Sequence, residues 1–163
     1  MGDLPPLDAD EAAFWRPLTR IITVLPRALD DQFLPETGLT MTDYTVLVEL
    51  SEAPGGLMRL SALAAATALS LSRISRVVDD LTRRGLVEKR KCAEDGRAAN
   101  AALTEAGLVK LQAAYPGHLA RVRASVFDQL SAEDIRTAGP VLNRLAAALD
   151  QDQTTADCQE RDE

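Results

Sequence analysis

In the middle of the chain, two short helical patterns follow each other with almost no linker, which favours folds built around a helix-turn-helix. The first helix is expected from about Ser61 to Ala66 and the second from about Leu71 to Arg84. Thr67-Ala68-Leu69 makes a tight turn between them. Ser70 is placed to cap the second helix and Gly85 to end it, so both boundaries carry their own signals.

A hairpin pattern comes directly after this unit. LVEKRK at 86–91 and AANAAL at 98–103 are short extended candidates joined through CAEDGR. The Asp95-Gly96 pair in the connection is typical of a hairpin turn, although residues 98–102 are poor in β-branched side chains. The sequence therefore predicts a mainly α chain with a small β-hairpin wing.

Long helical patterns flank the central unit. Residues 11–33 have apolar side chains at helical spacing, and Pro17 and Pro26 within them predict a kink or a break. A shorter helix is expected at 42–52, where Thr40 and Asp43 are spaced as a capping box. A Pro-Gly-Gly turn at 54–56 ends this helix.

Two more helices are expected after the hairpin. The first covers 105–129 with an interruption at Pro116-Gly117, and the second starts at a capping box on Ser131 and ends near Asp150. Pro140 predicts a kink in that last helix. Residues 150–163 are acidic with almost no apolar side chain, which is typical of a disordered tail.

Composition excludes several classes of protein. At 163 residues the chain is one domain by length, and no apolar run approaches the ~18 residues of a membrane span. The acidic N-terminus lacks the pattern of a signal peptide, so we expect a cytoplasmic protein. Cys92 and Cys158 form no disulfide framework or metal motif. With one histidine, no phosphate-binding loop and no nucleophile motif, we expect neither an enzyme nor a cofactor or metal site.

The positive charge of the chain is concentrated in its central region, although the whole chain has a formal net charge of −7. From Arg59 to Arg97 there are nine basic and five acidic residues, a net charge of +4. The remainder has nine basic and twenty acidic residues, a net charge of −11. This layout suits a protein that presents one basic face to a polyanion.

The second helix of the central unit has two chemically different faces. At about 100° per residue, Ile74, Val77, Val78 and Leu81 form a narrow stripe that should face the core. The opposite face offers small hydroxyls and guanidinium groups, which suit entry into a DNA major groove. The alternative is a solvated amphipathic surface helix, since Asp79 and Asp80 dilute the positive face.

The hairpin favours the nucleic-acid interpretation. Its basic side chains can meet the phosphate backbone, and Arg97 just past the turn can reach an adjacent minor groove. Asp95 is spaced to hold that guanidinium; alternatively it caps the turn and the arginine is incidental. The expected DNA-binding residues are Ser70, Ser72, Arg73, Ser75, Arg76, Arg83, Lys89, Arg90, Lys91, Asp95 and Arg97.

The run LSALAAATALSLSRISRVVDDLTRRGLVEKRKCAEDGRAANAAL at 60–103 resembles the winged helix-turn-helix core of the MarR (multiple antibiotic resistance regulator) family. LSxLA, VVDDLTRRGLVEKR, EDGRA and LTEAG occur in the family's order, and Asp95-Gly96-Arg97 matches its wing motif. The resemblance covers roughly residues 11–149. The prolines of the first helix, and the alanines and asparagine of the second wing strand, depart from the pattern.

The resemblance implies a homodimeric transcriptional regulator, usually a repressor, on a pseudo-palindromic operator of double-stranded DNA. After a flexible leader at 1–10, the DNA-binding part would cover about 41–104. The helices at about 11–35 and 105–149 would form the dimer, so the fold is a winged helix-turn-helix between dimerisation helices.

Many members of the family release DNA when a small, often aromatic or phenolic, effector binds between the dimerisation helices and the DNA-binding lobe. The candidates for such a site are Trp15, Arg16, Thr19, Tyr44, Tyr115 and His118. The alternative places Trp15 and Tyr44 in the core and His118 at the surface or an interface. Two other functions stay open: a winged-helix module that binds only proteins, and a thiol redox-responsive regulator acting through Cys92.

Overall fold

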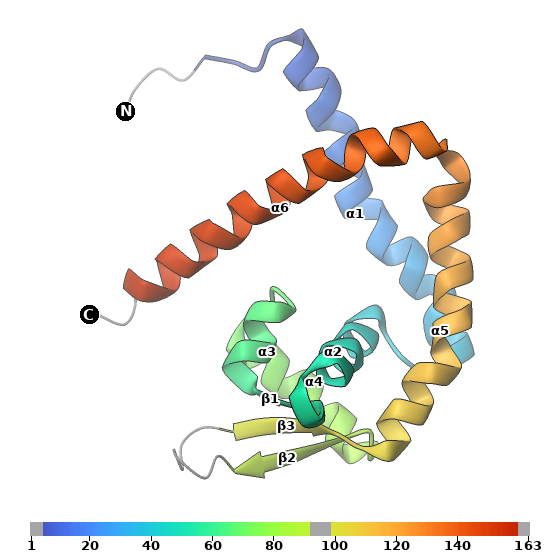
Figure 1. Ribbon diagram of the computed structural model, residues 1–163, viewed down its shortest axis with the longest axis vertical. Helices are drawn as coiled ribbons and strands as arrows, with labels where there is room; N and C mark the ends of the chain where they lie inside the picture. The colour runs from blue at the N-terminus through green and yellow to red at the C-terminus, as the bar shows by residue number, and fades with distance from the viewer. Residues whose placement is uncertain (1–4, 92–98, 160–163) are drawn as a thin grey trace. The chain divides into compact units, whose positions relative to one another are not determined.

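The computed structural model describes residues 5–91 and 99–159 and divides into two compact units, Met1–Arg121 and Val122–Glu163 (Figure 1). The described residues are mostly helical, with a small antiparallel sheet. The elements in chain order are α1 (Ala9–Thr37), α2 (Met41–Glu52), η1 (Pro54–Gly56), β1 (Leu57–Arg59), α3 (Leu60–Ala66), α4 (Leu71–Arg83), β2 (Val87–Lys91), β3 (Ala99–Leu103), α5 (Glu105–Ser125), η2 (Phe127–Gln129) and α6 (Ala132–Gln159).

The first helix is longer than its pattern predicted and is not broken. Asp8 and Glu11 form a capping box before Ala9, and Gly38 ends the helix in the left-handed conformation at φ +67°. Pro17, Pro26 and Pro35 all lie inside one continuous α1. Each proline removes only one backbone donor, and the remaining hydrogen bonds of a 29-residue helix maintain it.

The helices of the second half are also more continuous than expected. The interruption predicted at Pro116-Gly117 is absent, since α5 runs from Glu105 to Ser125 across Pro116. The last helix, α6, includes Pro140 and continues to Gln159, beyond the end expected near Asp150. Residues 151–159 contain neither glycine nor proline, and extending an existing helix costs far less than starting one.

The expected hairpin is present and is joined by a strand that the sequence did not indicate. The strand order is β1-β3-β2, with both pairs antiparallel. Leu57 pairs with Ala102 in one ladder, and Val87 pairs with Leu103 in the other. The alanines of the central strand β3 have a structural reason: α2 and α3 pack against this strand, and Ala101 and Ala102 are buried there.

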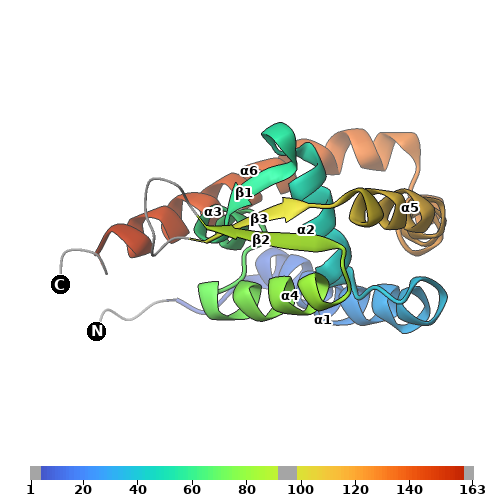
Figure 2. The same cartoon turned by 90° about the horizontal axis from the view of Figure 1, so that it is seen from below.

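The core of the first unit forms where α2, α3, α4 and the sheet meet (Figures 1 and 2). Three α4 side chains, Ile74, Val78 and Leu81, are completely buried, and Val77 is partly buried against them. The apolar stripe predicted for this helix is therefore confirmed. The other fully buried side chains of the core include Phe33, Leu39, Val46, Leu47, Leu50 and Leu63.

A close contact fixes the start of α5 against the turn after α4. The hydroxyl of Thr104 donates to the carbonyl of Gly85 at 2.8 Å and accepts from the amide of Gly107 at 3.0 Å. A Cβ at Gly107 would lie 2.1 Å from the carbonyl oxygen of Leu86. The absence of a side chain at this position allows α5 to begin directly beside the turn that follows α4.

The second unit contains the end of α5, η2 and α6. The capping box predicted on Ser131 is present: the amide of Asp134 donates to the Ser131 hydroxyl at 3.1 Å, and the amide of Ser131 donates to the Asp134 carboxylate at 2.9 Å. The Ser131 hydroxyl also donates to the Asp134 carboxylate at 2.6 Å, and this bond, together with the one from the Ser131 amide, lowers the pKa of the Asp134 carboxyl. Within residues 5–91 and 99–159, no helix combines the length and apolar character needed to cross a membrane.

Candidate nucleic-acid interface

The N-terminal half of α4 presents a polar, cationic face. Ser70 caps the helix, with its hydroxyl accepting from the amide of Arg73 at 3.3 Å. The same hydroxyl lies 3.2 Å from that of Ser72. The buried stripe lies on the opposite side of the helix, and Leu71 is the exposed large apolar side chain among the described residues of α4.

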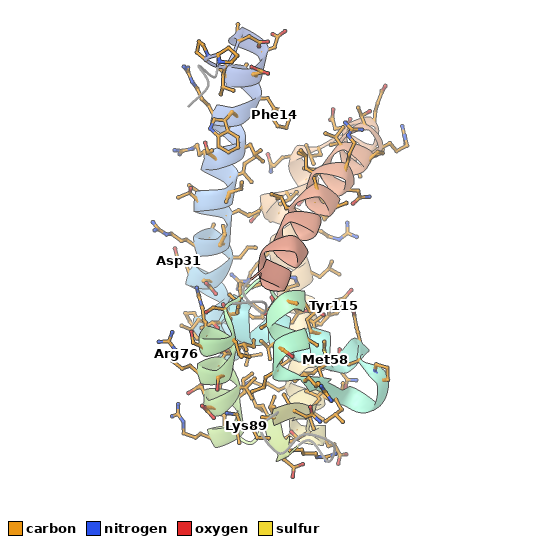
Figure 3. All side chains as sticks on the ribbon, turned by 90° about the vertical axis from the view of Figure 1, so that its left-hand side faces the viewer. Phe14, Asp31, Met58, Arg76, Lys89 and Tyr115 are labelled. Atoms are coloured by element: carbon orange, nitrogen blue, oxygen red, sulfur yellow. The ribbon has the colours of Figure 1, made fainter. Side chains whose placement is uncertain are left out.

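Arg73 and Arg76 are the exposed cations of this face, and Arg76 extends outward from α4 (Figure 3). The Arg76 Nε donates to the carbonyl of Ser72 at 3.4 Å. Among the described residues, neither guanidinium forms a salt bridge. Both retain the planar donor edge that can form two parallel bonds to guanine O6 and N7.

Three other cations near α4 and β2, namely Lys89, Arg90 and Arg83, form salt bridges with carboxylates of the protein. Lys89 of β2 lies 2.6 Å from a carboxylate oxygen of Asp79 and 3.5 Å from the hydroxyl of Ser75, as expected from the contact between α4 and β2 (Figures 2 and 3). Arg90 pairs with Glu88 at 3.0 Å, and Arg83 pairs with Asp80 at 2.8 Å. The sequence did not reveal these pairs, because they depend on side-chain direction.

Part of the predicted wing site lies outside the described residues. This applies to Asp95 and Arg97 of the wing motif and to Cys92. Lys91 ends β2, but its side chain is also outside the described part. The described part of the interface therefore consists of α4 and the first wing strand, β2.

The sequence analysis did not identify an interaction between Arg84, at the C-terminal end of α4, and Asp43 of α2. Arg84 was counted only as a positive charge, and Asp43 only as a helix cap. In the structure, the Arg84 guanidinium lies 3.1 Å from the Asp43 carboxylate, and Asp43 is the buried charged residue among those described. Sequence offers no signal for this pairing, since the partners are far apart along the chain.

The six effector candidates do not form one cluster. Trp15, Arg16 and Thr19 lie on the N-terminal half of α1, where Trp15 is 51% exposed and does not belong to the core. The Thr19 hydroxyl donates back to the carbonyls of Trp15 and Arg16. Trp15 is separated from Phe33 by roughly 27 Å along the helix at 1.5 Å per residue.

Tyr44, Tyr115 and His118 belong to the opposite end of the first unit. The rings of Tyr44 and His118 lie 4.5 Å apart, and both contact Phe33 of α1. Burial raises the pKa of Tyr44, with a further contribution from Tyr115, and burial lowers the pKa of His118. The buried Nδ1 of His118 has no hydrogen-bond partner among the described residues.

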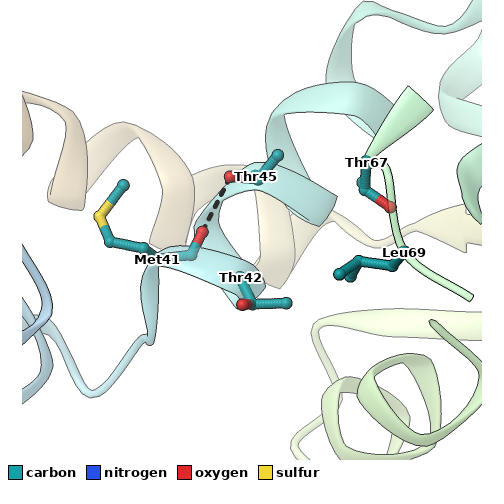
Figure 4. A pocket seen from close by; sticks show the side chains of 5 residues that line it. All are labelled: Met41, Thr42, Thr45, Thr67 and Leu69. Atoms are coloured by element: carbon teal, nitrogen blue, oxygen red, sulfur yellow. Dashed lines mark hydrogen bonds between the residues drawn. The ribbon is translucent and has the colours of Figure 1, made fainter. Parts of the chain in front are cut away.

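Neither of two hollows formed by described residues of the first unit is lined by this aromatic cluster. One, about 520 Å³ in volume, is lined by Leu7, Glu11, Phe14 and Trp15 near the start of α1. The other is about 140 Å³ and lies between α2 and the turn before α4, where the Thr45 hydroxyl donates to the Met41 carbonyl (Figure 4). The second is smaller than the ~300 Å³ typical of a small-molecule site.

The described residues contain no group of three or more histidine, cysteine or carboxylate side chains arranged to hold a metal ion. The most distinctive chemistry in the described part is instead the hydroxyl and guanidinium face of α4 beside a basic strand. This is the chemistry of phosphate and base-edge recognition.

Comparison with known proteins agrees with this geometry. Residues 37–98 match the model of the MarR family. AbsC, a MarR family transcriptional regulator from Streptomyces coelicolor, is 36% identical, with 90% of this chain and 98% of AbsC covered and a TM-score of 0.81. Sco3205 from the same organism, solved in complex with DNA, is 34% identical. The match covers 91% of this chain and 93% of Sco3205, with a TM-score of 0.83.

A curated relative gives the same family relationship by sequence. The HTH-type transcriptional repressor YetL of Bacillus subtilis is 26% identical over 124 residues, which cover 74% of each chain. The similarity to the Streptomyces proteins spans nearly their full length, so it includes the flanking helices as well as the helix-turn-helix and wing. The chain is a member of the MarR family of transcriptional regulators.

Proposed function

We propose that the protein binds a pseudo-palindromic DNA operator as a homodimer, with α4 in the major groove and the β2–β3 wing toward the flanking minor groove. The observation that carries this proposal is the exposed pair Arg73 and Arg76, which form no salt bridge with any described residue, beside small hydroxyls on α4. A likeness to Sco3205, whose structure contains DNA, supports the same assignment.

Within this proposal, the residues have separate roles. Ser72, Arg73, Ser75 and Arg76 face base edges, and Ser70 and Arg83 meet phosphates at the two ends of α4. Lys89, Arg90 and Lys91 contact the backbone from the wing, and Arg97, oriented by Asp95, enters the minor groove. These contacts require double-stranded DNA as the partner and involve no cofactor and no catalytic step. We place the protein in the cytoplasm, where bacterial DNA is found.

The homodimer is supported by unusually exposed apolar side chains. On α1 they include Phe14, Ile21 and Ile22, and on α6 they include Leu142, Leu145 and Leu149. Exposed apolar surface of this extent marks an interaction site. In this proposal, the helices at about 11–35 and 105–149 form the dimer. Two-fold symmetry of the dimer then places the centres of the two DNA half-sites about 10 base pairs apart.

We further propose that the protein represses transcription until a small aromatic or phenolic molecule binds. The similar protein YetL is a transcriptional repressor, which supports repression rather than activation. The aromatic group of Tyr44, Tyr115 and His118 supports the ligand class, because the buried Nδ1 of His118 needs a hydrogen-bonding partner. A thermal-shift screen of phenols tests this step; a ligand that stabilises wild-type protein but not His118→Phe is expected.

The operator proposal is tested by titrating the protein with DNA from upstream of its own gene, against a random duplex of equal length. We expect a clear preference for the upstream DNA, with affinity that falls steeply as salt rises. Arg76→Ala should cost about 1–3 kcal/mol at one base pair per half-site and relax the preference there. Equal affinity for both duplexes would contradict the proposal and favour a module that binds proteins only.

A further inference from the structure

We propose that Arg84 is a positioning residue: it fixes the recognition helix against the junction of α1 and α2, and so sets operator preference without touching DNA. This inference rests on the proposed DNA-binding function. It differs from the groove contacts above, because Arg84 acts through other residues of the protein.

The Arg84 guanidinium connects three separate parts of the first unit. One of its terminal nitrogens lies 3.1 Å from a carboxylate oxygen of Asp43 in α2 and 3.2 Å from Asp80 in α4. The other donates to the carbonyl oxygen of Gly38 at 2.7 Å. A planar guanidinium holds such partners in a fixed relative geometry, which a lysine ammonium cannot do.

Asp43 gives this connection its strength. The residue is 7% exposed, and its carboxylate also accepts from the amide of Thr40 in the capping box of α2. A buried carboxylate needs a compensating charge, and Arg84 supplies one across the boundary between helices. The interaction is therefore much less screened by water than the surface pairs of α4.

The third partner belongs to the junction that leads out of α1. Gly38 ends α1 with a left-handed φ of +67°, and its amide donates to the carbonyl of Leu34. Just beyond it, the amide of Met41 donates to the Asp30 carboxylate of α1 at 2.6 Å. The junction is thus held from α1 through Asp30 and from the end of α4 through Arg84.

The neighbouring arginine shows that this arrangement is specific. Arg83 has a side chain that is 75% exposed and, among the described residues, is paired with Asp80 alone, whereas the Arg84 side chain is 30% exposed. On a helical wheel Arg83 lies about 20° from Ser72, on the solvent face, and Arg84 lies about 120° from it, toward the core. Arg83→Met is therefore a matched substitution that removes the same charge from the same end of α4.

The first measurement compares binding to upstream DNA and to a random duplex over a range of salt. Arg84→Met should weaken operator binding by roughly 2- to 30-fold, the usual range of coupling through a positioning residue. Random-duplex affinity and the salt slope should stay unchanged. Arg83→Met should instead lower both affinities and reduce the slope.

Conservative variants separate positioning from a general loss of stability. Arg84→Lys keeps a charge for Asp43 but loses the fixed geometry, so its operator affinity should lie between those of wild type and Arg84→Met. Asp43→Asn should resemble Arg84→Met, and combining the two should add little further loss. All affinities are measured at a temperature where circular dichroism shows folded protein. Arg84→Lys remains informative if Arg84→Met does not fold.

Two results would overturn the inference: unchanged operator preference in folded Arg84→Met, or a salt slope reduced as in Arg83→Met. Hydrogen exchange without DNA gives a separate test. Amides of Gly38 and Met41 should exchange faster in Arg84→Met and at the wild-type rate in Arg83→Met. If wild-type protein shows no operator preference, the proposed function fails, and the exchange rates alone decide whether Arg84 holds the junction.

Discussion

Single residues on α4 and β2 divide the positive charge into paired and unpaired groups. Arg73 and Arg76 have no salt bridge among the described residues, while Lys89 is held by Asp79 and Arg83 by Asp80. Composition showed the excess of positive charge in this region, but it gave no reason for the two adjacent acids, Asp79 and Asp80, on a helix that we propose to bind DNA. The salt bridges give a structural reason for these acids, because Asp79 pairs with Lys89 and Asp80 pairs with Arg83.

The pair of Asp79 and Lys89 leads to a prediction about selectivity. Asp79→Asn frees the Lys89 ammonium for phosphate, so affinity for a random duplex should rise by roughly 1.5- to 5-fold, the effect of an exposed pair worth about 0.2–1 kcal/mol. The salt slope should become steeper, and the ratio of operator to random binding should fall. Asp10→Asn, an equal charge change near the start of α1, is the control. An unchanged ratio in Asp79→Asn would argue against this role for the pair.

At the scale of elements, local signals in the sequence predicted most of the helices. The N-caps at Thr40, Ser70 and Ser131 are confirmed, because capping depends on residues three positions apart. Strand β1 was missed: three residues carry no readable period, and its partner β3 lies far along the chain. The prolines of α1 and α5 do not break their helices, because the remaining hydrogen bonds of each helix maintain it.

The same distinction between local and distant information applies to the candidate site. The face of α4 followed from helical spacing, so Ser72, Arg73 and Arg76 could be placed from sequence. The partners of Arg84 could not, because they are set by how α1, α2 and α4 pack. Nor could the separation of Trp15 from His118, which depends on the unbroken length of α1.

The two glycines of α5 give a prediction at this scale. Gly107→Ala places a Cβ 2.1 Å from the Leu86 carbonyl oxygen, which neither backbone can avoid without shifting. We expect a loss of about 1–3 kcal/mol in the free energy of unfolding, measured by urea denaturation. Gly117→Ala would meet only a carboxylate oxygen of Glu36 at 3.8 Å, so it should be neutral or stabilise α5 by up to ~1 kcal/mol. Equal stabilities of the two variants would show that α5 can move away from the turn.

At the scale of the whole molecule, the chain combines an acidic majority with a basic lobe. Its net charge of −7 disfavours non-specific attachment to DNA, while the +4 of residues 59–97 gives the approaching duplex one favourable face. Apart from Leu71, the exposed large apolar side chains of the described residues lie outside residues 59–97, many of them on α1 and α6. Charge and apolar surface thus separate the proposed DNA contact from the proposed dimer contact.

This separation predicts that the dimer can be weakened selectively. Ile21→Asp on α1 and Leu71→Asp at the start of α4 replace apolar residues that are both 55% exposed. If Ile21 is buried in the dimer, its replacement should raise the dissociation constant at least about tenfold, since burying such a side chain contributes ~1.5–3 kcal/mol. Sedimentation at micromolar concentration measures the effect, and Leu71→Asp should remain dimeric. Equal behaviour of the two variants would exclude this face of α1 from the interface.

The short strand β1 has a mechanical consequence. Strand β1 precedes the helix-turn-helix, and its partner β3 ends the wing. Their pairing therefore closes a loop of chain that contains both the helix-turn-helix and the wing. A force applied at either end of this loop is carried by the β1–β3 ladder and bypasses the recognition helix. The lobe should accordingly turn as one body on DNA and open as one cooperative unit.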